Sequence, residues 1–127
     1  MKKILCIDDD RSILELRRRV LESSGYDVLT APSGQDGLKL VSRGEIDLVI
    51  LDYMMPGMDG AEVAESLKSE FPKLPVIAMS SVQVPDRMMA KVDACVPKGQ
   101  RVDVLLSAIS RALSSTLSST LAEQQPS

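Results

Sequence analysis

The stretch VILDYMMPGMDG, residues 49–60, leads an apolar run straight into a carboxylate. The apolar run begins at Ile46, ends at Leu51 and has the length of a strand. Asp52 follows it at once, and a loop rich in glycine and proline comes next. Because burying a carboxylate is unfavourable unless it is paired or used, we expect Asp52 to bind or to react with another group.

The rest of the chain alternates between apolar runs of strand length and segments with helical spacing. The other expected strands are residues 3–7, 27–31, 75–80 and 92–97. The expected helices are residues 12–23, 34–42, 61–70, 86–91 and 102–113. Strands that are apolar almost throughout are typical of a sheet buried on both faces. The sequence therefore predicts an α/β domain, with a doubly wound five-stranded parallel sheet and helices on each side.

Chemically active side chains follow four of the expected strands. In a doubly wound sheet the ligand site lies at the carboxyl ends of the strands, so we expect these side chains to meet at one edge. They are Asp8, Asp9 and Asp10 after the first strand, Asp52 after the third, Ser80 at the end of the fourth and Lys98 after the fifth.

Three consecutive aspartates repel one another unless a cation or a proton intervenes. Part of the run has a structural explanation, because Asp9 or Asp10 could cap the helix that begins near Ser12. Capping does not account for an acidic pair together with Asp52. Mg²⁺ is commonly held by one or two carboxylates and phosphate, so the pattern favours a magnesium site.

These motifs together resemble the receiver domain of two-component response regulators. The resemblance rests on the acidic pair in IDDD at 7–10, on LDYMMPGMDG at 51–60, on the pair SS at 80 and 81, and on PKG at 97–99. It extends from Lys2 to about Leu113. It implies a flavodoxin-like fold like that of chemotaxis regulators, with strand order 2-1-3-4-5, and a signalling domain rather than an enzyme with its own substrate.

The resemblance also implies a role for each site residue. Asp52 would attack the phosphohistidine of a sensor kinase, or of a phosphotransfer protein, and become an acyl phosphate. Asp9 would bind Mg²⁺ directly and Asp8 largely through water, and the backbone carbonyl of Met54 would complete the protein ligands. Lys98 would pair with Asp52 or with a phosphoryl oxygen, and Ser80 would hydrogen-bond that oxygen after transfer.

The chain departs from the family pattern near the fifth strand. Lys98 follows Ser80 by 18 positions (98 − 80), about four fewer than is usual in the resembled family, which is close to one helical turn. We therefore expect a short fourth helix. Cys95 stands where the family usually has Tyr or Phe, and Pro97 precedes the lysine instead of following it. The aromatic switch is expected to be missing, and a cis peptide after Lys98 is not expected.

Length and composition limit the classes of function. The 127 residues, 44% hydrophobic and 26% charged, suffice for one core but not for two ordinary domains. The formal net charge of −3 gives no reason to expect direct contact with nucleic acid or an acidic membrane. The chain has no histidine, so it cannot supply imidazole for catalysis.

Neither the two cysteines nor the first residues of the chain indicate targeting to another compartment. Cys6 and Cys95 lie in apolar runs and are interpreted as small buried residues rather than as a disulfide or metal site. The short apolar run at the start fits neither a signal sequence nor a membrane span, and we expect a cytoplasmic protein. Residues 1–113 are assigned to the domain and residues 114–127 to a Ser/Thr-rich tail or linker, unless Leu113, Leu117 and Leu121 extend the last helix.

Two alternatives stay open at this point. One is a haloacid-dehalogenase-like phosphatase in which Asp8 is the nucleophile and Asp10 the acid/base, although this leaves Asp52 unexplained. The other is a degenerate receiver that serves only as a protein-interaction module. The sequence names neither the kinase nor the downstream target, which could be another protein or an output domain.

Overall fold

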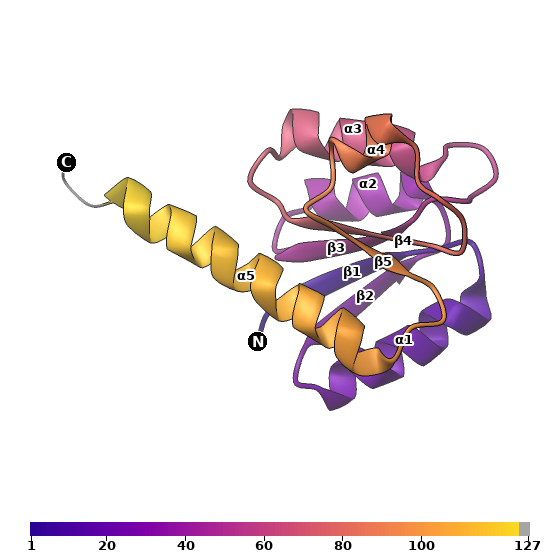
Figure 1. The fold of residues 1–127 in the computed structure, drawn as a ribbon, viewed down its shortest axis with the longest axis horizontal. Coiled ribbons are helices and arrows are strands. Elements are labelled where there is room, and N and C mark those ends of the chain that lie inside the picture. Colours follow the sequence, from indigo (N-terminus) through magenta and orange to yellow (C-terminus); the bar gives the residue numbers. More distant parts are fainter. Residues whose placement is uncertain (125–127) are drawn as a thin grey trace.

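The computed structural model describes the backbone of residues 1–124 and the side chains of residues 1–115. Its centre is one parallel sheet of five strands in the order β2-β1-β3-β4-β5 (Figure 1). The strands are β1 (Lys3–Ile7), β2 (Asp27–Ala31), β3 (Leu48–Asp52), β4 (Val76–Ser80) and β5 (Ala94–Pro97). This confirms the predicted fold class, including the strand order.

Helices cover both faces of the sheet, as Figure 1 shows. Helices α2, α3 and α4 lie on one face, and α1 and α5 lie on the other. Their bounds are α1 (Arg11–Ser23), α2 (Gly34–Ser42), α3 (Gly60–Glu70), α4 (Asp86–Met89) and α5 (Val102–Gln124). Because successive side chains of a strand point to opposite faces, the sheet separates the apolar core into two clusters.

The central strands are buried most completely. Every residue of β3 and of β4 is buried, which explains why their sequences are apolar almost throughout instead of alternating. The two polar residues in these strands, Asp52 and Ser80, are the last residues of β3 and β4. The fold therefore places its buried polar groups at one edge of the sheet.

Helix starts are fixed close to that edge by side-chain caps. The carboxylate of Asp10 accepts hydrogen bonds from the backbone N–H groups of Ser12 and Ile13 at 2.9 and 3.2 Å, and Asp59 caps α3 through the N–H of Glu62. At Gly60 a Cβ atom would lie 2.5 Å from the carbonyl oxygen of Asp52. Only glycine allows α3 to begin so close to the end of β3.

Some element boundaries differ from those expected. Strand β3 begins at Leu48 rather than Ile46, because Asp47 turns its carboxylate to accept the backbone N–H of Lys3 at 2.7 Å. Helix α4 has four residues and ends at Met89 rather than at residue 91. No cis peptide occurs among the described residues, Lys98 included.

Helix α5 continues to Gln124, well past Leu113. Its later part extends beyond the edge of the sheet (Figure 1). The backbone thus follows the extended-helix alternative, whereas Leu117 and Leu121 lie outside the residues whose side chains are described. The division of the chain at residue 113 stays a prediction.

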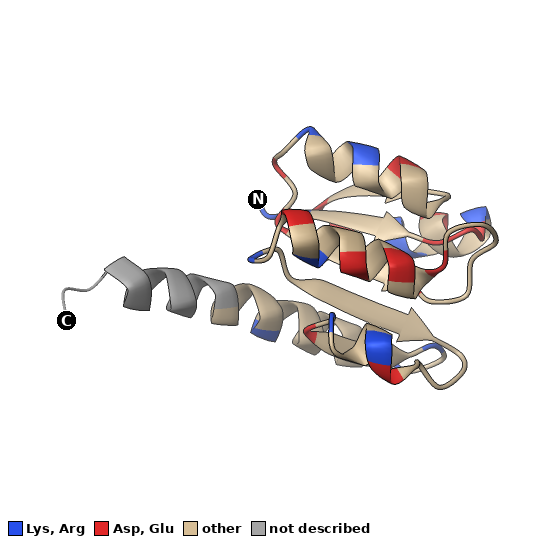
Figure 2. Cartoon of the chain, turned by 90° about the horizontal axis from the view of Figure 1, so that it is seen from above, with Lys and Arg blue, Asp and Glu red and all other residues tan. Residues whose placement is uncertain are grey.

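Charged residues of both signs are interspersed on the face formed by α2, α3 and α4 (Figure 2). Acidic residues recur along α3, with Lys68 near its end. As far as the chain is described, no helix combines the length and apolar character needed to span a membrane.

Candidate functional site

Three carboxylates meet where β1 and β3 end. The two strands pair in parallel, with Ile7 opposite Leu51, so the residues that follow, Asp8 and Asp52, come side by side. Asp8, Asp9 and Asp52 each offer an oxygen within 4.8 Å of the others. The structure therefore brings together the three side chains predicted to surround a metal.

Asp52 is the last residue of β3 and, like Asp8, is deeply buried. The residue is 2% exposed, and its Oδ1 atom is buried with no hydrogen-bond partner. Burial raises the pKa of Asp52, and the lysine Lys98 offsets only part of this effect. A buried carboxylate oxygen without a hydrogen bond is unfavourable on its own and is open to a ligand.

Lys98 brings a positive charge to the carboxylates from the loop after β5. Its Nζ atom lies 3.1 Å from Asp52 Oδ1 and 3.2 Å from Asp8 Oδ2. Burial lowers the pKa of Lys98, but pairing with Asp52 and Asp8 outweighs it, so the pKa is raised overall. Lys98 therefore stays charged at neutral pH and is shared between two acids.

Ser80 is buried at the end of β4, next to the lysine loop. Its backbone carbonyl accepts a hydrogen bond from the N–H of Lys98 at 2.9 Å, which fixes the relative positions of the two residues. Its Oγ atom accepts the N–H of Val82 at 3.0 Å. The hydroxyl can still donate its hydrogen to a group bound at this edge.

Two further residues considered in the sequence are not members of this group of side chains. Met54 is in the loop between β3 and α3, with its side chain 58% exposed, and the role of its carbonyl stays a prediction. Asp10 is outside the group because its carboxylate caps α1. The capping explanation thus holds for one aspartate of the run, and Asp8 and Asp9 remain for chemistry.

The group of acids fits a divalent cation such as Mg²⁺. Asp8 Oδ2 and Asp52 Oδ1 are both buried without hydrogen-bond partners, and Asp9 next to them is exposed to water. Hard cations favour carboxylate oxygens and keep several waters. These two buried oxygens, which have Lys98 as a close ionic partner, and one exposed carboxylate are a suitable donor set for such an ion.

The structure adds one charged residue that the sequence did not reveal. Arg17 on α1 is 8% exposed, and its Nη1 atom lies 3.7 Å from Asp8 Oδ2. In the sequence it is the first of three consecutive arginines and is not distinguished from the other two. Only the helical period, with Leu14 and Leu21 buried on the same face, could have indicated that it points inward.

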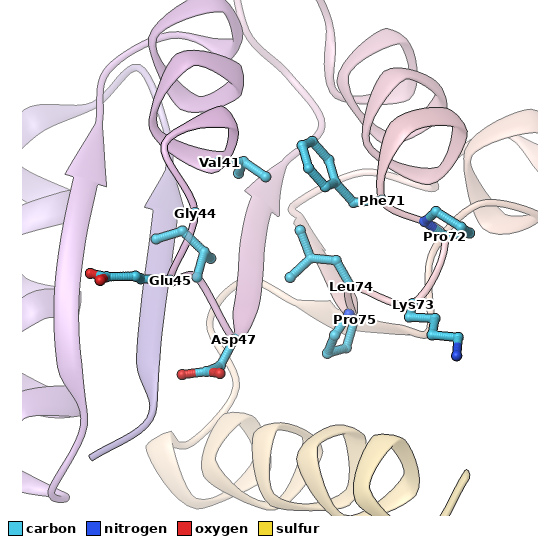
Figure 3. A pocket seen from close by; sticks show the side chains of 10 residues that line it. Val41, Gly44, Glu45, Asp47, Phe71, Pro72, Lys73, Leu74 and Pro75 are labelled. Atoms are coloured by element: carbon cyan, nitrogen blue, oxygen red, sulfur yellow. The ribbon is translucent and has the colours of Figure 1, made fainter. Parts of the chain in front are cut away.

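A separate cavity of about 540 Å³ lies at the opposite edge of the sheet (Figure 3). It is lined by residues that precede β3 and β4, such as Asp47 and Pro75, together with Val41 and Phe71. None of the converging carboxylates is among its lining residues. The cavity is therefore unrelated to the acidic site.

Comparison with known families gives one match that covers most of the chain. Residues 4–110 match the response regulator receiver domain. The alkaline phosphatase synthesis transcriptional regulatory protein PhoP of Bacillus subtilis (strain 168) is 41% identical over 80 residues, which are 63% of this chain and 33% of that protein. Response regulator MprA of Mycobacterium leprae (strain TN) is 38% identical over 92 residues, 72% of this chain and 40% of that protein.

Solved structures agree with the sequence match. A response regulator receiver domain protein (CheY-like) from Methanospirillum hungatei JF-1 has a TM-score of 0.88 and 27% identity, covering 94% of this chain and 98% of that one. Response regulator protein TrrA from Thermotoga maritima, solved in complex with Mg²⁺-BeF, has a TM-score of 0.85 and 34% identity. This match covers 89% of the chain and 100% of TrrA.

The chain spans only 33% and 40% of the two curated relatives. What the matches support is therefore the family of this domain, not the activity of the whole relatives.

Proposed function

This chain belongs to the receiver-domain family of two-component response regulators, and we propose that Asp52 accepts a phosphoryl group in a Mg²⁺-dependent reaction. The observation that carries the proposal is the meeting of Asp8, Asp9, Asp52 and Lys98 at one edge of the sheet. The donor would be the phosphohistidine of a sensor histidine kinase or of a phosphotransfer protein.

The transfer needs one bond to form and one to break. A carboxylate oxygen of Asp52 attacks phosphorus, and the bond between phosphorus and the imidazole nitrogen of the donor breaks. The imidazole leaves with the electron pair, and Asp52 becomes an acyl phosphate. Asp52 is the suitable nucleophile because its carboxylate ends β3 inside the group of acids, with Lys98 Nζ 3.1 Å from Oδ1.

The surrounding residues would hold the metal and the transferred group. Asp9 and Asp52 would bind Mg²⁺ directly, with Asp8 acting largely through water and the carbonyl of Met54 as a further ligand. When bound, the ion offsets negative charge on the phosphoryl oxygens. Lys98 would move from Asp52 to a phosphoryl oxygen, and Ser80 would donate its hydroxyl hydrogen to another.

The two alternatives fit the site less well. A phosphatase with Asp8 as nucleophile requires Asp10 as acid/base, and the Asp10 carboxylate is occupied in capping α1. A degenerate receiver would have no need to keep three carboxylates and a lysine within reach of one another. We therefore propose a phosphoacceptor that promotes its own phosphorylation and slow dephosphorylation and has no separate substrate.

A small phosphodonor tests this proposal without a kinase. Incubation with acetyl phosphate and Mg²⁺ is expected to add one phosphoryl group to the intact protein, because Asp52 is proposed as the single nucleophile. Asp52→Asn should gain none, and wild type should gain none after EDTA removes the metal. A phosphoryl group that persists in Asp52→Asn, measured by intact mass, contradicts the assignment.

We further propose that the signal is read through the short helix α4. Phosphorylation adds about −1.5 to −2 charges, which would draw Ser80 toward the new oxygens together with the loop before α4. Cys95 is exposed on β5, so the expectation that it is buried was wrong, and it offers no ring to follow Ser80 inward. The change would then stay in the loop and in α4, which the exposed pair Arg87 to Glu65 links to α3 at 2.9 Å.

Amide hydrogen exchange with beryllofluoride as phosphoryl mimic tests this mode of output. We expect the largest changes in protection between Ser80 and Lys91, because Ser80 makes the new contact and α4 has only four residues. Smaller changes are expected around Cys95. Changes centred on residues 95–102, with residues 81–91 silent, would refute this mode.

The partners of the chain follow from the same proposal. A sensor histidine kinase or phosphotransfer protein would act before it, and a protein target or an output domain would act after it. We propose a cytoplasmic location, where such kinases deliver the phosphoryl group. The interspersed surface charge (Figure 2) gives no support for direct contact between this domain and nucleic acid.

A further inference from the structure

Arg17 is a buried cation that the proposed phosphotransfer does not use. It stands on the inner face of α1 between Leu14 and Leu21, which are buried in the core between α1 and the sheet. Cys6 of β1 belongs to the same core. Burial raises the pKa of Cys6 to about 12, and the charge of Arg17 offsets part of that rise. The guanidinium thus enters an otherwise apolar core.

The guanidinium of Arg17 lies next to the acidic site. Its Nη1 atom is buried, forms no hydrogen bond and lies 3.7 Å from Asp8 Oδ2. Lys98 Nζ lies 3.2 Å from the same oxygen. Asp8 itself is 0% exposed, so water screens the attraction between these groups only weakly.

Charge balance at the site changes when Arg17 is included. Three carboxylates, Asp8, Asp9 and Asp52, face two cations, Lys98 and Arg17. The formal charge is then −1, whereas Lys98 alone would leave −2. A divalent cation entering the site therefore meets half the net negative charge that it would meet without Arg17.

We propose that Arg17 serves as a permanent counter-charge to Asp8 and weakens the binding of Mg²⁺. The proposal rests on the proposed function, because it assumes that the acids hold this ion. Arg17 would keep the acidic site stable when no metal is bound. It would also raise the Mg²⁺ concentration that is needed to fill the site.

The opposite effect would arise if Arg17 were needed mainly to orient Asp8. Other contacts already fix that carboxylate: Asp8 Oδ1 accepts the backbone N–H of Asp10 at 3.0 Å, and Lys98 lies beside Oδ2. Arg17, at 3.7 Å and without a hydrogen bond, adds charge more than direction. Its electrostatic effect on a divalent ion should therefore outweigh its effect on geometry.

Titration of the unphosphorylated protein with magnesium chloride tests the proposal. The amide signal of Tyr53, next to Asp52, serves as the NMR probe, because the chain has no tryptophan for fluorescence. Arg17→Met keeps an unbranched side chain that can pack between Leu14 and Leu21. We expect it to tighten the Kd for Mg²⁺ by roughly tenfold, the contribution of one nearby unit charge even under strong screening.

Two further variants separate local charge from other causes. Arg19→Met removes the same charge from the exposed side of α1, where Arg19 pairs with Glu15 at 3.2 Å, and should leave the Kd unchanged. Arg17→Lys keeps the charge and should stay close to wild type. If Arg17→Met fails to fold, the affinity of Arg17→Gln is measured instead, with the same expectation.

Each outcome decides one question. Tighter binding in Arg17→Met, with both control variants near wild type, supports the counter-charge. Unchanged or weaker binding in Arg17→Met, while wild type binds Mg²⁺, overturns this inference and leaves the proposed function standing. Failure of wild type and Arg17→Met alike to bind the ion overturns the metal site itself and the inference with it.

Discussion

Asp9→Asn is expected to weaken Mg²⁺ binding by about 100-fold or more, because it removes one of the few charged oxygens that a hard cation binds. Asp9 is the exposed member of the group whose oxygens lie within 4.8 Å of one another. A neutral amide oxygen keeps the shape of the side chain but loses its charge. Calorimetric or NMR titration with magnesium chloride measures the loss, and phosphorylation by acetyl phosphate should fall with it.

Asp10→Asn is the matched control for this prediction. It removes a carboxylate from the adjacent position, but Asp10 caps α1 and is not a member of the group of acids. Asparagine caps a helix about as well as aspartate, so the fold and the Mg²⁺ affinity should both be retained. An equal loss of affinity in the two variants would mean that only overall charge matters, and an unaffected Asp9→Asn would refute the site.

Lys98→Met is expected to slow phosphorylation by acetyl phosphate on the order of 100-fold, the usual effect of removing one group that stabilises charge in the transition state. Lys98 Nζ is within 3.2 Å of both Asp8 and Asp52. Without Lys98, the phosphoryl oxygens lose a nearby positive charge. The rate is followed by intact mass at fixed Mg²⁺ and donor concentrations.

Lys91→Met provides the comparison, because Lys91 is exposed in the segment between α4 and β5. It removes the same charge from the domain but not from the site, and its rate should match that of wild type. Loss of rate with unchanged Mg²⁺ binding in Lys98→Met would place the role of the lysine on the transferred group. A normal rate in Lys98→Met would contradict that role.

The sequence was sufficient to predict the sheet and most of the site. Apolar runs that end in Asp8, Asp52 and Ser80 indicate parallel strands buried on both faces. Parallel strands bring their carboxyl ends to one edge, which is why residues far apart in the chain can be predicted to lie close together. The three carboxylates and Lys98 indeed converge there.

Other features depend on tertiary contacts that local pattern does not reveal. Arg17 belongs to a run of three arginines, and only packing of α1 on the sheet decides which of them is buried. Strand β3 starts late because Asp47 binds the backbone of Lys3, 44 residues away. Low helix propensity of Ser and Thr favoured an end of α5 near Leu113, whereas the helix continues to Gln124.

The central claim is that the phosphoryl group is carried by Asp52. Reduction of the phosphorylated protein with borohydride converts an acyl phosphate to an alcohol, so the modified aspartate becomes homoserine, which peptide mass spectrometry can locate. The account predicts homoserine at position 52 after treatment with acetyl phosphate and Mg²⁺, and at no position when Mg²⁺ is left out. Homoserine at position 8, or at any aspartate other than Asp52, would contradict it.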